Sequence, residues 1–151
     1  MKPKIQKVLV PLDGSAGSQA VLPTVEELAR AEGARVRLLH VAPAPESVIM
    51  NGRVIAYADQ EAARIEQGVL AYLRKVAAEL SGLEVEAAVR FGDPVEEIVK
   101  EAESAGVDLI ALATHRRTGV RRLLKGSVAE QVERATAIPV LLVRHGEQVA
   151  A

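Results

Sequence analysis

The sequence of 151 residues contains no cysteine, no tryptophan, two tyrosines and one phenylalanine. Without cysteine there is no disulfide, thiol nucleophile or thiolate metal ligand, which suits a reducing compartment. The aromatic residues Tyr57, Tyr72 and Phe91 are too few for the stacking platforms that bind single-stranded nucleic acid. These absences exclude thiol chemistry and argue against a nucleic-acid partner.

The chain also lacks a large net charge and a long apolar run. Its formal net charge is −1, so no global field attracts nucleic acid or an anionic membrane surface. No apolar run reaches the length that spans a bilayer, and the N-terminus lacks the apolar segment of a signal peptide. We therefore expect a cytoplasmic protein without a membrane partner. We also expect a single domain over residues 1–151, with a core at about 5–144 and a polar tail at 145–151.

One stretch, from Leu109 to Glu130, combines three features of a phosphate site. It opens with the apolar run Leu109 to Ala113, which predicts a strand buried on both faces. It closes with Ser127 and Glu130 at the spacing of a helix capping box. A helix N-terminus after a cationic loop suits an anion, although a solvated basic surface is the alternative. The basic residues between are Arg116, Arg117, Arg121, Arg122 and Lys125.

Strand patterns alternate with helix patterns along the whole chain. Apolar runs predict five strands, at Lys7–Leu12, Val36–Val41, Leu83–Phe91, Leu109–Ala113 and Pro139–Val143. Apolar residues three and four apart predict helices over residues 20–31, 55–80, 94–105 and 128–135. Such alternation gives right-handed crossovers and a parallel sheet with helices on both faces. The expected fold class is α/β, with three layers.

The strand order follows from how apolar each strand is. The first and fourth strands are the most apolar and belong in the middle, which gives the order 3-2-1-4-5. Its switch point, where such sheets bind ligands, then lies between these two strands. This places Asp13 beside the loop 114–126, although Asp13 could instead cap the helix after it. The loop 42–53, rich in Pro and Gly, is long enough to be a functional flap.

The histidines and short motifs give weaker indications. His40 lies within a strand pattern and is expected to be a core histidine with a hydrogen-bond partner, while His115 on the cationic loop is a candidate ligand contact. We expect no resident metal site, because no HExxH or paired-His spacing is present, and no GxSxG nucleophile motif occurs.

Several segments together resemble the universal stress protein family. They are VLVPLDGS at residues 8–15, LLHV at 38–41, DLIALATHRRTGVRRLLKGSVAEQV at 108–132 and IPVLLVR at 138–144. The resemblance extends from Lys7 to Arg144 in the right order and spacing. It implies a Rossmann-like fold of the adenine nucleotide α-hydrolase-like type, a role in stress response, and a homodimer. It also implies ATP as ligand, with Mg²⁺ or Mn²⁺ as a candidate companion ion.

The resemblance also implies a set of nucleotide contacts. Nucleotide-binding members carry Gly, two residues, Gly, nine residues, then Gly-Ser or Gly-Thr; here Ala113 and Arg116 stand at the first two glycines, and Gly126-Ser127 match the end. Asp13 would contact the adenosine moiety, the Val41 backbone the adenine edge, and residues 126–128 the phosphates. The full expected set is Pro11, Leu12, Asp13, Val41, Ala113, Thr114, His115, Arg116, Arg117, Gly126, Ser127 and Val128.

Competing functions remain beside ATP binding with at most weak hydrolysis. Arg116 in place of a glycine keeps open a dimeric interaction module without nucleotide. A pyrophosphate-splitting hydrolase or transferase would need an SGGxDS loop, where this chain has DGSAGS at 13–18, and a phosphorelay receiver would need an Asp where Arg90-Phe91-Gly92 stand. In any of these proteins an apolar edge strand needs cover, so we expect a homodimer through Val140–Val143.

Overall fold

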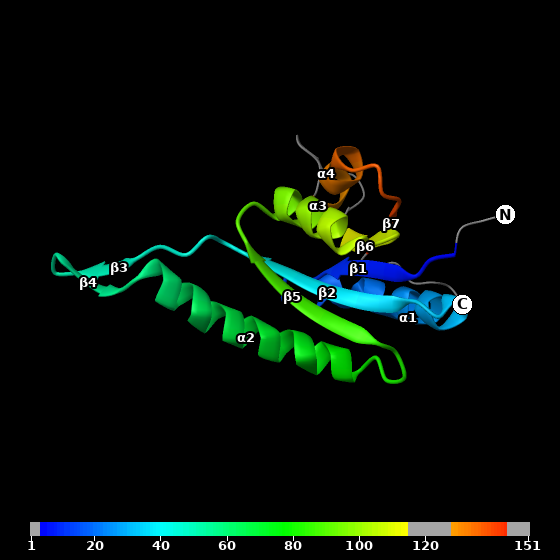
Figure 1. Cartoon of the computed structure of the whole chain (residues 1–151), viewed down its shortest axis with the longest axis horizontal. Helices are drawn as coiled ribbons and strands as arrows, with labels where there is room; N and C mark the ends of the chain where they lie inside the picture. Colours follow the sequence, from blue (N-terminus) through cyan, green and yellow to red (C-terminus); the bar gives the residue numbers. More distant parts are fainter. Residues whose placement is uncertain (1–3, 115–127, 145–151) are drawn as a thin grey trace.

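The computed structural model describes residues 4–114 and 128–144 (Figure 1). Its elements in chain order are β1 (Lys7–Pro11), the 3-10 helix η1 (Gly17–Val21), α1 (Leu22–Glu32), β2 (Arg35–Ala42), β3 (Val48–Met50), β4 (Arg53–Ala56), α2 (Ala58–Ala78), β5 (Val85–Phe91), α3 (Pro94–Ala105), β6 (Leu109–Thr114), α4 (Val128–Ala135) and β7 (Val140–Arg144). None of the described helices is long and apolar enough to cross a membrane.

Five strands form the main sheet in the order β5-β2-β1-β6-β7, and all neighbours are parallel. This confirms the expected order, because β5, β6 and β7 are the third, fourth and fifth of the predicted strands. The most apolar strands lie in the middle, where both faces are covered. The sheet therefore has its switch point between β1 and β6, as expected.

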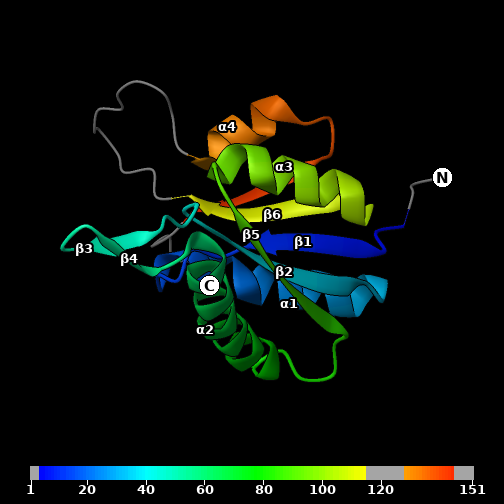
Figure 2. The ribbon, with the colours of Figure 1, turned by 60° about the vertical axis from the view of Figure 1, so that its left-hand side comes forward.

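Helices cover both faces of the sheet, as Figures 1 and 2 show. On one face α1 and α2 pack on side chains of β1 and β2 such as Val10 and Leu38. On the other face α3 and α4 pack on side chains such as Leu9 and Ile110. Because successive side chains of a strand point to opposite faces, each central strand contributes to both cores.

Two helix starts follow local sequence signals. The Asp93 side chain accepts a hydrogen bond from the Glu96 amide at 3.0 Å, with Pro94 in the first turn of α3. Pro23 lies in the first turn of α1, and the five residues before that helix form η1 instead. The α-helix thus begins at Leu22, two residues later than predicted, with the proline in its first turn.

The segment after β2 is a β-hairpin, which differs from the expected loop. β3 and β4 pair antiparallel around Asn51 and Gly52, whose φ angles are 53° and 76°. Two residues with positive φ between paired strands suit an Asn-Gly turn. The hairpin projects from the body in Figure 1, and Ile49 and Met50 are 64% and 57% exposed. Residues 55–57 belong to β4 and the turn after it, so α2 begins three residues later than predicted.

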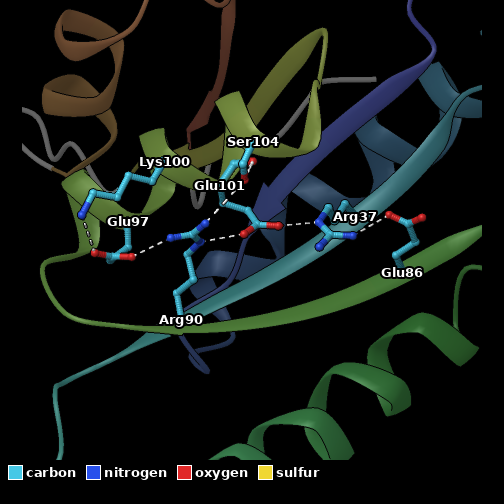
Figure 3. Close-up of polar contacts among 7 residues, drawn as sticks. All are labelled: Arg37, Glu86, Arg90, Glu97, Lys100, Glu101 and Ser104. Atoms are coloured by element: carbon cyan, nitrogen blue, oxygen red, sulfur yellow. Dashed lines mark hydrogen bonds and ion pairs between the residues drawn. The ribbon is translucent and has the colours of Figure 1, made fainter.

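A network of charged side chains joins α3 to β2 and β5 (Figure 3). Glu101 is 5% exposed and accepts hydrogen bonds from Arg37 Nε at 2.5 Å and Arg90 Nε at 2.6 Å. Arg37 also donates to Glu86 at 2.7 Å, and Arg90 to Glu97 at 2.9 Å. The buried carboxylate therefore has a guanidinium on each side, which satisfies its charge.

Candidate functional site

The chain turns away from the sheet directly after β1, at the switch point. The last paired residues of β1 and β2 are Pro11 and Leu39, and the Leu12 amide then donates to the Leu39 carbonyl at 2.8 Å. β6 runs parallel to β1 and ends at the buried Thr114. Asp13 therefore follows β1 at the carboxyl edge of the sheet, beside the end of β6.

The Asp13 side chain is held by a turn of its own. Its Oδ1 accepts hydrogen bonds from the Ser15 amide at 2.8 Å and the Ser15 hydroxyl at 2.6 Å. Gly14 between them has a φ of 92°, which favours glycine. Asp13 does not cap the next helix: η1 has Ala16 at its N-cap position and no side-chain cap. The capping alternative is therefore wrong.

Ser18 stabilises the turn at Asp13–Ser15 through three hydrogen bonds. Its hydroxyl donates to the Ser15 carbonyl at 2.9 Å and accepts from the Asp13 amide at 3.2 Å, while its own amide donates to Ser15 Oγ at 3.1 Å. Ser18 is 8% exposed, and these bonds are partly shielded from bulk water. Sequence reasoning missed both serines, although Asp followed two residues later by Ser is typical of such turns.

The turn keeps Asp13 ionised and leaves one of its oxygens available. Partial burial raises the pKa of Asp13, but the Ser15 hydrogen bonds, helped by Ser18, lower it more, and the net pKa lies below the ordinary value. Both lone pairs of Oδ1 are used by Ser15. Oδ2 receives no hydrogen bond from any described residue. An ionised, oriented acceptor at this edge can bind a hydroxyl or amino donor of a ligand.

The backbone of Val41 extends past the point where β1 ends. Backbone groups of Arg35 and Leu39 bond on the β1 side, through Arg35 N to Gln6 O at 2.9 Å and Leu12 N to Leu39 O at 2.8 Å. Backbone groups of successive residues point alternately to the two neighbouring strands. Val41, two residues after Leu39, therefore directs its N–H and C=O to the β1 side as well. The pairing of β1 with β2 stops at Pro11 and Leu39. Val41 therefore directs a donor and an acceptor beyond the end of β1, at the carboxyl edge of the sheet where Asp13 lies.

His40 has the partner that was expected of a core histidine. Its Nδ1 lies 2.8 Å from the Leu12 carbonyl oxygen, and the side chain is half-buried. Since a carbonyl only accepts, Nδ1 is the protonated nitrogen. The bond joins β2 to the residue just before Asp13.

The structure places some of the other expected site residues and leaves the rest untested. Pro11 and Leu12 are buried, so only their backbone groups can face a ligand, whereas Ala113 and Thr114 end β6 and Val128, 40% exposed, begins α4. His115, Arg116, Arg117, Gly126 and Ser127 lie outside the described residues. Within the described residues, no group of three or more His, Cys, Asp or Glu side chains could hold a metal ion.

Comparison with known proteins identifies a family. The model of the universal stress protein family matches residues 4–144. The chain is 30% identical over 148 residues to the universal stress protein YxiE of Bacillus subtilis, an alignment that covers 91% of this chain and 98% of YxiE. These matches extend over the sheet, the helices and the switch point.

Solved structures share the fold. The protein MJ0577 of Methanocaldococcus jannaschii superposes with a TM-score of 0.73 at 26% identity, covering 97% of this chain and all of the other. A universal stress protein in complex with cAMP gives 0.69 at 22% identity, with 95% and 100% covered. A third, from Archaeoglobus fulgidus in complex with dAMP, gives 0.63 at 22% identity, with 93% and 99% covered.

Proposed function

The chain belongs to the universal stress protein family, and from this premise we propose that it binds an adenine nucleotide, ATP, at the carboxyl edge of its sheet. In this proposal the protein acts in stress response with little or no turnover of the nucleotide. The observation that carries the proposal is the ionised Asp13, held by Ser15 at the switch point with Oδ2 available. Doubly wound sheets bind ligands at this place.

The backbone of Val41 is the proposed partner of the adenine ring. Adenine carries an acceptor, N1, beside a donor, the N6 amino group, and a backbone N–H with a neighbouring C=O complements this pair. Guanine presents O6 at the same position, which would face the Val41 carbonyl with a second acceptor. Asp13 Oδ2 would then accept a hydrogen bond from a hydroxyl of the ribose. The Val41 contacts would make the site prefer adenine over guanine.

The phosphates are assigned to the segment before α4. Gly126 and Ser127 precede Val128, the first residue of α4, where amide groups and the helix dipole favour an anion. Thr114, at the end of β6, together with Ala113, His115, Arg116 and Arg117, completes the proposed contacts. A Mg²⁺ or Mn²⁺ ion would be held through the phosphate oxygens rather than by a protein cage.

The nucleotide complexes of two proteins of similar fold support adenine as the recognised part. The ligands of those proteins, cAMP and dAMP, share an adenine ring but differ in sugar and phosphate. Purification of this protein under native conditions, followed by acid extraction and mass spectrometry, tests the proposal. We expect an adenine nucleotide in the extract. A nucleotide-free protein that also fails to bind added ATP would favour the dimeric interaction module.

The two edges of the sheet differ, and this supports a homodimer through β7. Edge strand β5 carries Glu86 and Arg90, both held in ion pairs, and charges of this kind discourage pairing with another sheet. Edge strand β7 has four apolar, half-buried residues, Val140 to Val143. We therefore propose that β7 pairs with the same strand of a second copy.

Light scattering at micromolar concentration is expected to give twice the 16.1 kDa mass of one chain. The Val140→Lys variant should be a monomer, because a charge at the start of β7 opposes pairing. Val85→Lys, at the start of the other edge strand, is the matched control and should remain a dimer. A monomeric parent protein, or a monomer only with Val85→Lys, would contradict the proposal.

A further inference from the structure

We propose that His40 is a positioning residue that keeps the Val41 N–H free for the ligand by taking the Leu12 carbonyl oxygen. This role rests on the proposed function, in which Val41 contacts the adenine ring. The hydrogen bond of its ring is to the Leu12 carbonyl oxygen, so in this proposal it acts through the backbone that follows β1.

The pairing of β1 and β2 stops one hydrogen bond before it would reach Val41. In a parallel ladder every second residue of a strand bonds to a given neighbour: its N–H donates to one residue there, and its C=O accepts from the residue two positions further on. The Leu12 amide bonds to the Leu39 carbonyl at 2.8 Å, and the next bond of the ladder would run from the Val41 N–H to the Leu12 carbonyl. That bond is not formed between these two described residues, and the register ends at Pro11 and Leu39.

The imidazole of His40 donates to the Leu12 carbonyl oxygen, the same acceptor that the Val41 N–H would use. Nδ1 of His40 lies 2.8 Å from the Leu12 oxygen, a normal hydrogen-bond length. His40 belongs to β2, so the Leu12 carbonyl is bound by a side chain of β2 rather than by the β2 backbone. The carbonyl of the buried Leu12 is thereby satisfied without Val41, which removes the penalty of an unpaired acceptor that would otherwise favour the Val41–Leu12 bond.

The consequence is that the Val41 N–H is available to the proposed ligand instead of being used by the backbone after β1. If the ladder closed by one bond, the Val41 N–H would be used and β2 would be drawn toward Leu12. The Val41 carbonyl would keep its direction but lose the donor beside it, and the paired recognition of an adenine edge would fail. His40 therefore sets how far the pairing of β1 and β2 extends, and so which backbone groups of β2 remain for the proposed ligand.

Two variants separate a hydrogen-bond donor from a space-filling side chain. His40→Leu removes the donor, while His40→Asn keeps an N–H near the place of Nδ1. In His40→Leu, we expect exchange of the Val41 amide to slow by about tenfold or more as it becomes hydrogen-bonded. Titration calorimetry should show AMP binding weakened by about tenfold, the effect of one lost hydrogen bond. His40→Asn should resemble the parent in both measurements.

The parent protein alone provides a further test that does not depend on folding of a variant. Its Val41 amide should exchange freely without ligand and become protected when AMP is added, and ¹H–¹⁵N spectra should show Nδ1 of His40 as the protonated nitrogen. A protected Val41 amide in the ligand-free parent, an unchanged amide in His40→Leu, or protonation of Nε2 alone would overturn the inference. If the parent binds neither AMP nor ATP, the proposed function fails instead, and Val41 exchange still decides whether His40 controls the ladder.

Discussion

Replacing Gly126 by valine is expected to abolish binding of ATP. Gly126 lies outside the described residues, so the reasoning comes from the sequence: it stands two residues before α4 begins at Val128. Phosphate at a helix start must meet backbone N–H groups directly, and a branched side chain there would intervene. Titration calorimetry of Gly126→Val with ATP measures this loss.

Arg116→Gly is the informative companion to this variant. Arg116 also lies outside the described residues, at the second glycine position of the nucleotide-binding pattern. A guanidinium suits phosphate oxygens, so we expect that its removal weakens ATP binding by tenfold or less, about 1.4 kcal/mol. Much tighter binding by Arg116→Gly would identify the arginine as a plug of the phosphate site. Binding that survives Gly126→Val would show that the phosphates lie elsewhere.

Glu101→Gln is expected to lower the free energy of unfolding by about 2–3 kcal/mol, or roughly 4–12 °C in Tm. Glu101 is 5% exposed between Arg37 and Arg90, and glutamine keeps its shape but removes its charge. The estimate is below the cost of breaking a fully buried pair, because both arginine side chains remain about one-quarter exposed. Denaturant unfolding of Glu101→Gln measures the change, and Glu103→Gln, exposed on the same helix, is the matched control.

The same variant should change the response to acid. Burial raises the pKa of Glu101, but hydrogen bonds from Arg90 and Arg37 lower it more, so its net pKa in the folded protein lies below the ordinary value. A carboxyl with a lowered folded pKa stabilises the protein above its unfolded pKa of about 4.3, and this contribution is lost as the pH falls through the folded value. The stability difference between parent and Glu101→Gln should therefore shrink below about pH 4. A difference that does not change with pH would contradict the role of the charge.

Much of the fold could be predicted because the signals are local. The apolar content of each strand placed β1 and β6 in the middle, and Asp93-Pro94 marked the start of α3 with both a cap and a fixed φ. The hairpin is a case where two local signals compete: Pro43 and Pro45 favour a loop, while Asn51-Gly52 favours the tight turn that the structure has.

The position of Asp13 in the sheet could be predicted, but its hydrogen bonds could not. That Asp13 would lie at the switch point follows from strand order alone. That Ser15 saturates Oδ1, or that His40 bonds to the Leu12 carbonyl, depends on the residue at which β1 leaves the sheet. The residue at which the pairing ends depends on how β1 and β2 lie against each other in the folded sheet, and the residue pattern of one strand does not reveal it.

Thermal unfolding with and without ATP tests the central claim, that the switch point binds an adenine nucleotide. The sample must first be shown to be nucleotide-free by extraction. With ATP and Mg²⁺ at about a hundred times the dissociation constant, binding adds about 2.7 kcal/mol, or roughly 5–11 °C in Tm for a domain of this size. GTP at the same concentration should give a smaller shift in Tm, because O6 of guanine would face the Val41 carbonyl oxygen and both atoms are acceptors. No shift with millimolar ATP would contradict the account.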